Sequence, residues 1–210
     1  MRLVKFTHAC VRIEDAGRRL LIDPGVWTEP AAFDGVTDIL VTHEHDDHLD
    51  LARIVAVAAS RPVRLFAPEP VRDLAEKAGL AGTVTVVAAG AEFSAGGFRV
   101  AAVGGEHAEI YDGLPGCANL GYVIEGVYHP GDSYFVPRQR VTTLLVPAAA
   151  PWGKLREALD MTRAIAPGRA FPIHDRALSP DVGYENFDGW MEYQGGTEYA
   201  RIPVGDSVTL

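Results

Sequence analysis

The chain has 210 residues, of which 19 are basic and 28 acidic, so its formal net charge is −9. Hydrophobic residues make up 48% and charged residues 22%, a balance typical of folded proteins that excludes a disordered tail, a coiled coil or a collagen-like rod. No apolar run approaches the roughly 20 residues that cross a bilayer, and the acidic balance disfavours a broad electrostatic contact with nucleic acid. We therefore expect a cytoplasmic protein with one domain over residues 1–210, and neither nucleic acid nor a membrane as its partner.

The first half of the chain alternates predicted strands and helices. Apolar runs predict strands over residues 3–6, 10–14, 19–22, 38–42 and 63–66. Helices are expected over residues 49–59 and 70–78, the second of them closed by Gly79. This alternation predicts a sheet whose strands are covered by helices.

The second half repeats the alternation. Strands are predicted over residues 84–87, 98–103, 120–125, 127–128, 143–146 and 170–173. Residues 153–165 are expected to form a helix, because Leu155, Leu159 and Thr162 recur at the spacing of one amphipathic face. The chain beyond Asp175 is polar and rich in aromatic residues, and its pattern predicts no element.

The strongest chemical signal follows the predicted strand at residues 38–42. Residues 43–48 read His-Glu-His-Asp-Asp-His, which places three imidazoles and three carboxylates within six positions. Burying such groups is costly unless partners satisfy them, and imidazole with carboxylate suits zinc, or iron or manganese. His43 and His45 can face one ion, while Asp47 and His48 can turn toward a neighbouring one.

Three further candidates lie just past the ends of predicted strands. His107 follows the strand at residues 98–103, Asp132 follows residues 127–128, and His174 comes directly after residues 170–173. Loops from several strands converge at the edge of a sheet, where ligands and catalytic groups gather. We therefore expect these side chains to join the cluster at residues 43–48.

This pattern resembles the metallo-β-lactamase superfamily. Residues 43–48 fit its His-x-His-x-Asp-His signature, and the resemblance extends over residues 5–174. The further matching features are the Asp23-Pro24 pair after an early strand, the Gly-Asp-Ser of residues 131–133, and His174 at the end of a late strand. Within the superfamily, the chain is most similar to small metal-dependent hydrolases related to L-ascorbate-6-phosphate lactonase, whose Gly-His-Ser-like opening is loosely matched by residues 7–9.

The resemblance implies an α/β fold, a four-layer αββα sandwich, with a site for two divalent ions at one edge of the sheets. The implied ligands are His43, His45 and His107 for the first ion, Asp47, His48 and His174 for the second, and Asp132 as the bridge between them. Asp23 would orient a ligand imidazole through its other ring nitrogen. Zinc is the first expectation for both ions, with manganese and iron as alternatives.

The implied activity is that of a metal-dependent hydrolase. A metal-bridging hydroxide would attack a small ester, lactone, amide or phosphodiester, because paired ions lower the pKa of the water between them. Asp47 would be catalytic as well as a ligand, since its carboxylate can orient the attacking water or accept its proton. The expected partner is a small-molecule substrate.

The same residue pattern has four alternative interpretations. A nuclease would usually carry an added RNA-binding arm, and a flavodiiron protein would have an acidic ligand in place of His45. An iron-dependent thiolesterase or sulfur dioxygenase stays open, because the same ligands can hold iron. A metal-binding or partner-binding protein without activity is the remaining alternative, and the complete ligand set speaks against it.

The sequence leaves the roles of several residues and loops undecided. His8 and His129 each have a functional and a structural interpretation, and so do the loop aromatics Trp27, Tyr111 and Trp152. Cys10 and Cys117 are expected to be reduced thiols, because two cysteines form no disulfide framework. The loop at residues 109–118, with Pro115, and the segment at residues 176–196 are each candidates for a lid, and the latter also for a homo-oligomer interface.

Overall fold

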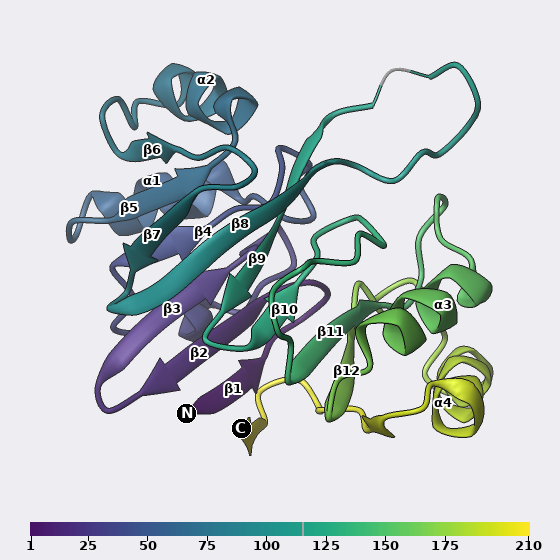
Figure 1. Cartoon of the computed structure of the whole chain (residues 1–210). Coiled ribbons are helices and arrows are strands. Elements are labelled where there is room, and N and C mark those ends of the chain that lie inside the picture. Colours follow the sequence, from purple (N-terminus) through teal and green to yellow (C-terminus); the bar gives the residue numbers. More distant parts are fainter. Residues whose placement is uncertain (115) are drawn as a thin grey trace.

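Two β-sheets lie face to face in the computed structural model, which describes residues 1–114 and 116–210, and helices cover the outer sides of both sheets (Figure 1). The predicted α/β class and four-layer αββα sandwich are confirmed. None of the helices in the described residues is long and apolar enough to cross a membrane.

The first sheet has the strand order β14-β1-β2-β3-β4-β5-β6. Its strands are β1 (Arg2–Lys5), β2 (Val11–Asp15), β3 (Arg18–Ile22), β4 (Asp38–Leu40), β5 (Arg64–Ala67), β6 (Val84–Val86) and β14 (Ser207–Thr209). Strands β3 to β6 run parallel, and the strands from β14 to β3 pair antiparallel. The outer face is covered by α1 (Leu51–Ala58) and α2 (Glu69–Lys77), and a short 3₁₀ helix, η1 (Pro30–Phe33), precedes β4.

The second sheet has the strand order β13-β12-β11-β10-β9-β8-β7. Its strands are β7 (Glu92–Ala95), β8 (Phe98–Glu106), β9 (Ala118–Ile124), β10 (Val127–His129), β11 (Thr143–Pro147), β12 (Arg169–Ile173) and β13 (Glu198–Tyr199). The outer helices are α3 (Leu155–Ile165) and α4 (Val182–Gln194). Because β8 and β10 both pair antiparallel with β9, and β10, β11 and β12 pair parallel, β8, β10, β11 and β12 end at the same edge.

The hydrophobic core has three layers because both faces of each sheet are covered. Successive side chains of a strand point to opposite faces, so Leu20 and Ile22 of β3 pack between the sheets while Leu21 packs under the helices. Phe98 of β8, in the second sheet, belongs to the same core cluster as Leu20 and Ile22. The layered fold therefore follows directly from the sequence, because successive apolar residues of one strand fill the core on opposite faces of the sheet.

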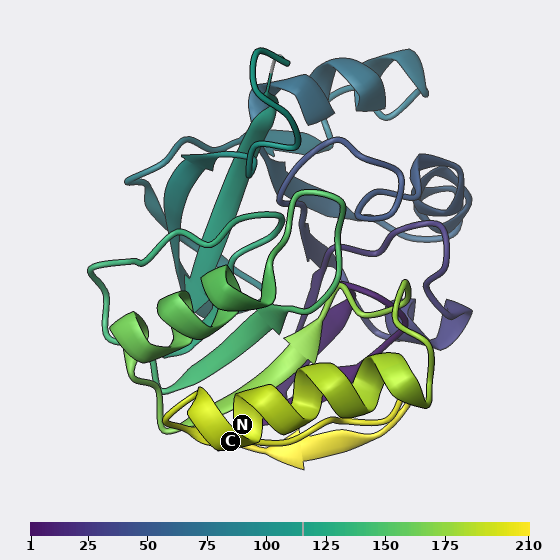
Figure 2. The ribbon, with the colours of Figure 1, turned by 90° about the vertical axis from the view of Figure 1, so that its right-hand side faces the viewer.

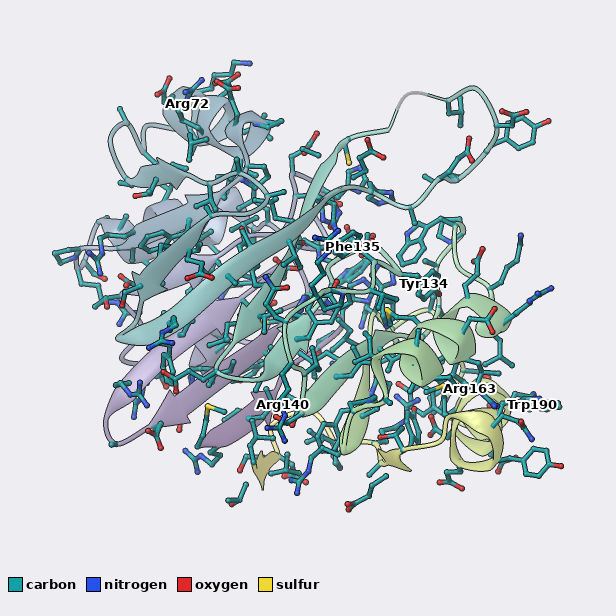
Figure 3. The ribbon with its side chains drawn as sticks, viewed as in Figure 1. Arg72, Tyr134, Phe135, Arg140, Arg163 and Trp190 are labelled. Atoms are coloured by element: carbon teal, nitrogen blue, oxygen red, sulfur yellow. The ribbon has the colours of Figure 1, made fainter. Side chains whose placement is uncertain are left out.

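The segment after Asp175, for which the sequence predicts no element, completes both sheets. Strand β13 pairs with β12, α4 packs over the second sheet through Phe187 and Met191, and β14 pairs with β1. The two chain termini consequently lie side by side (Figure 2). Arg163 of α3 and Trp190 of α4 line one groove where these two helices lie beside each other (Figure 3).

Candidate metal centre

The candidate site lies where loops of both sheets meet at one edge. The first sheet supplies residues 43–48, which follow β4, and the second supplies His107 after β8, Asp132 after β10 and His174 after β12. The loop at residues 43–48 packs so closely on the turn after β3 that a Cβ on Gly25 would collide with the Asp47 carbonyl. A glycine at that position is thus required for the approach of the two loops.

The candidate ligands form two adjoining groups, in each of which one ligand atom per residue lies within 4.8 Å of the others. The first group is His43, His45, His107 and Asp132, and the second is His8, Asp47, His48 and His174. All seven residues predicted as ligands are therefore brought together. His8, which the sequence leaves open, joins the second group, whereas Asp46 is exposed and belongs to neither.

Asp132 lies between the two groups. Its Oδ1 is 2.9 Å from Nε2 of His48, and its Oδ2 is 3.3 Å from Nε2 of His107 and 3.3 Å from Nε2 of His174. This carboxylate therefore contacts imidazoles of both groups, as the predicted bridging ligand would.

In three of the candidate histidines, a contact at Nδ1 fixes the ring so that Nε2 faces the site. Nδ1 of His48 donates to Oδ2 of Asp23 at 2.7 Å, which gives the fully buried Asp23 the contact expected of it. Nδ1 of His107 and Nδ1 of His174 each lie 2.6 Å from a backbone carbonyl oxygen. Such contacts set the tautomer and orientation of metal-binding imidazoles. In each of these rings Nε2 is consequently directed at the centre of the site.

His43 and His45 face the first group through different nitrogens. Nδ1 of His43 donates to Oγ1 of Thr42 at 2.9 Å, because that hydroxyl itself donates to Asp23. Nε2 of His43 lies 3.0 Å from Nδ1 of His45, so His45 presents Nδ1 to the group. Its Nε2 points to the thiol of Cys117, 3.9 Å away, and Cys117 is a free cysteine as expected.

The donor atoms fit divalent ions. Nε2 of His48, Nε2 of His174 and Oδ1 of Asp132 are buried and have no hydrogen-bond partner among the described residues. Nε2 of His48 lies 2.9 Å from Oδ1 of Asp132, and Nε2 of His174 lies 3.3 Å from Oδ2 of Asp132, in both cases without the alignment of a hydrogen bond. An unpaired buried polar atom is costly. Cations between them would satisfy all three at once, so the residues present suit the metal that the pattern implies.

The ionisation of these groups also suits a cation. Burial raises the pKa of Asp132, but the charge of His48 and the contacts with His107 and His174 outweigh burial and hold this pKa well below its usual range. Burial lowers the pKa of His174, but the carboxylates of Asp132 and Asp47 raise it to about 9. The carboxylates are therefore ionised at neutral pH, and without metal His174 carries a proton that an ion would displace.

His129, the other histidine left open, has a structural role. Its Nε2 donates to the carbonyl oxygen of Ala9 at 2.9 Å, and its Nδ1 accepts from the backbone N–H of Gly131 at 3.1 Å. The ring is fully buried and belongs to neither group. It thus connects the turn before Asp132 to the first sheet.

Grooves flank the site on the side of the second sheet. His107 and Trp152 line one groove together with Tyr134 and Phe135, which follow β10 (Figure 3). Trp152 is buried and donates from Nε1 to Oδ2 of Asp132 at 3.2 Å, a contact without a signal in the sequence.

The loop between β8 and β9 borders a second groove. Ile110, Leu114 and Cys117 of this loop line the groove together with His45. The function of the loop as a lid stays a prediction, and its Pro115 lies outside the described residues.

Residues 2–174 match the family model described as the beta-lactamase superfamily domain. The chain belongs to this superfamily. This superfamily member is 39% identical to Protein Rv0786c of Mycobacterium tuberculosis over 219 residues, which covers 100% of both chains. It is 36% identical to UPF0173 protein PF0020 of Pyrococcus furiosus, with 83% of each chain covered, and so belongs to the UPF0173 family. The relationship to L-ascorbate-6-phosphate lactonase stays a prediction.

A solved structure shares the fold of this UPF0173 member. Igni18, a metallo hydrolase from Ignicoccus hospitalis, superposes with a TM-score of 0.77 at 20% identity, over 100% of this chain and 97% of that one. At this identity the likeness concerns the fold alone.

Proposed function

We propose that this metal-dependent hydrolase cleaves a small ester, lactone, amide or phosphodiester with two divalent ions. The observation that supports the proposal is the pair of adjoining donor groups with Asp132 between them. Their donors are imidazole nitrogens and carboxylate oxygens, which favours zinc and leaves manganese and iron as alternatives. When bound, such a pair of ions lowers the pKa of water and polarises a carbonyl or phosphoryl oxygen.

The chain's own residues divide the remaining work. Asp47 is the least buried of the candidate carboxylates, with 22% of its side chain exposed, and its pKa is held below the usual range by His174 and His8 against the effect of burial. Its carboxylate is thus ionised and open to solvent, as is needed to orient a water molecule and hold the water's proton. The grooves beside His107 and His45 would receive the substrate.

Metal stoichiometry is the first test. Elemental analysis of protein purified without chelator or affinity nickel should return two equivalents per chain, and a panel of lactones, esters and phosphodiesters would then be assayed in that metal. One equivalent would contradict the bridging role of Asp132. No metal, even after reconstitution with zinc and manganese, would contradict the proposal and favour a partner-binding protein. Iron would direct the assays to thioesters and persulfides instead.

A further inference from the structure

His8 is a member of the second donor group, although the implied ligand set does not include it. Its Nε2 lies 3.1 Å from Oδ2 of Asp47, and its ring centroid is 3.9 Å from that of His174. Only 4% of His8 is exposed, so its ring lies inside the fold while Asp47 reaches the solvent. An imidazole in this position either binds the ion directly or acts on it through Asp47.

The two nitrogens of His8 distinguish these roles. In His48, His107 and His174, Nδ1 is held by an oxygen atom and Nε2 faces the ligands, which is the arrangement of a metal-binding imidazole. Nδ1 of His8, in contrast, is buried and has no hydrogen-bond partner among the described residues. A neutral imidazole has one N–H, and placing it on Nε2 gives the Asp47 carboxylate a donor. The pattern is that of a hydrogen-bond donor to Asp47 rather than of a ligand.

The backbone at His8 is held in place for this contact. Its φ of 66° lies in the left-handed region, which residues with a Cβ seldom adopt. The carbonyl oxygen of His8 accepts from Nζ of Lys5 at 2.6 Å and from the backbone N–H of His174 at 3.2 Å. Lys5 is 1% exposed, and its ammonium group also lies 3.4 Å from Oδ1 of Asp175. A buried cation thus fixes the turn that carries His8 to the end of β12, next to His174.

We propose that His8 is a positioning residue for the second ion, holding the Asp47 carboxylate in its binding orientation through Nε2–H, with Lys5 fixing the turn. The inference rests on the proposed function because it requires a second ion. It leaves the ligand set unchanged and identifies a residue that acts on the second ion through Asp47, and it gives the buried Lys5 a role in the site.

Stepwise titration of the metal-free protein with Zn²⁺ and Co²⁺ tests the inference. We expect His8→Ala to bind the first ion like the wild type and the second about 10–100-fold more weakly, the usual effect of losing a hydrogen bond to a metal ligand. His8→Gln should restore most of the affinity, because the amide of glutamine can place an N–H near the position of Nε2. The Co²⁺ absorption spectrum of the second site should keep its shape in both variants, since the ligands are unchanged.

Trp27→Phe is the matched control. The indole of Trp27 meets the His8 ring edge-on with centroids 5.1 Å apart, so this variant changes the packing of His8 without removing its contact with Asp47. Both affinities should stay at the wild-type value, and thermal unfolding would confirm that every variant folds.

Three results would overturn the inference, and they can be told apart. Unchanged affinity for the second ion in His8→Ala would refute it while leaving the proposed function intact. A Co²⁺ spectrum of altered coordination number in His8→Ala would show that His8 is itself a ligand. A wild-type chain that binds a single ion would contradict the bridging role of Asp132 and this inference with it, and a chain that binds no ion would refute the proposed function as well.

Discussion

At the scale of single residues, Asp132 is the side chain that joins the two halves of the site. It is 2% exposed and is surrounded by His43, His48, His107 and His174, whose Nε2 atoms lie between 2.9 and 3.7 Å from its oxygens. Each imidazole could bind an ion from its own loop, but among the described residues only this carboxylate contacts imidazoles of both groups. The pairing of the ions therefore depends on it.

Replacing Asp132 by alanine should abolish the pairing. We expect Asp132→Ala to lose at least one equivalent of metal and about 100-fold or more in kcat/KM, because the chemistry that an ion supplies is worth several kcal/mol. Metal analysis and steady-state kinetics would measure both effects. Asp46→Ala, at an exposed position outside both groups, is the control and should resemble the wild type. A fully active Asp132→Ala chain with two ions would contradict the bridging role.

Trp152 should support metal binding through its hydrogen bond to Asp132, and not only line the groove for the substrate. Trp152→Phe removes the N–H that donates to Oδ2 of Asp132 and keeps an aromatic ring beside His107 and His174. Metal affinity should fall roughly tenfold, as for other hydrogen bonds to metal ligands, and metal titration would measure it. Tyr134→Phe is the control, since the Tyr134 ring packs on Trp152 but makes no contact with Asp132 among the described hydrogen bonds. Equal affinities of the two variants would refute this role.

The pH dependence of the metal-free protein follows from His174. Burial lowers the pKa of His174, but Asp132 and Asp47 raise it from 6.5 to about 9, so the folded chain holds a proton that the unfolded chain releases. The resulting stability is complete below pH 6.5 and is lost as the pH rises to about 9. His43, whose pKa is lowered, is neutral throughout this window. We expect urea unfolding to give a lower free energy at pH 9 than at pH 6.5, and His174→Gln to remove part of that difference.

At the scale of elements, the sequence predicts best those segments whose stability comes from their own pattern. Strands β3, β8 and β12 are recognised because their apolar runs fill the core, and the ligands are found because they follow such strands. The elements β13 and β14 are missed, because strands of two and three residues are held by pairing with β12 and β1 and not by any run of their own. The predictions thus fail where tertiary contacts decide the local structure.

The same reasoning explains which parts of the site the sequence leaves open. Residues 43–48 form one motif, so their spacing alone indicates a shared site. The contact of His8 with Asp47 joins positions 39 residues apart and depends on a left-handed backbone at His8, which no propensity predicts. The bond from Trp152 to Asp132 likewise depends on how the loop after β11 folds over the edge of the sheet.

Helix α4 provides a prediction at this scale. The helix contains Gly183 and Gly189, which weaken it, and its buried residues are Phe187 and Met191, so it is held by docking on the second sheet. Met191→Ala should lower the free energy of unfolding by about 2–5 kcal/mol, because it leaves a cavity at a fully buried position. Tyr193→Ala, at a side chain 76% exposed, should change it by less than about 0.5 kcal/mol. Denaturant unfolding would measure both, and equal effects would show that α4 does not dock as described.

At the scale of the whole molecule, the site draws its groups from both sheets. His8 and residues 43–48 come from the first sheet, whereas His107, Asp132 and His174 come from the second. Carboxylates and imidazoles from the two sheets meet at an edge where several ligand atoms have no hydrogen-bond partner among the described residues. Ions bound there would hold the two sheets together, so metal binding and folding should be coupled.

Metal removal should consequently destabilise the entire fold. A ligand that binds only the folded state adds about 2.7 kcal/mol at a free concentration 100 times its Kd, which for a chain of this size corresponds to roughly 5–10 °C in Tm. We expect a chelator to lower the Tm by at least this amount and added zinc to restore it. Asp132→Ala should have a low Tm that responds much less to zinc, because its groups no longer share a bridging carboxylate. A Tm that is the same with chelator and with zinc in the wild type would mean that ions do not connect the two sheets.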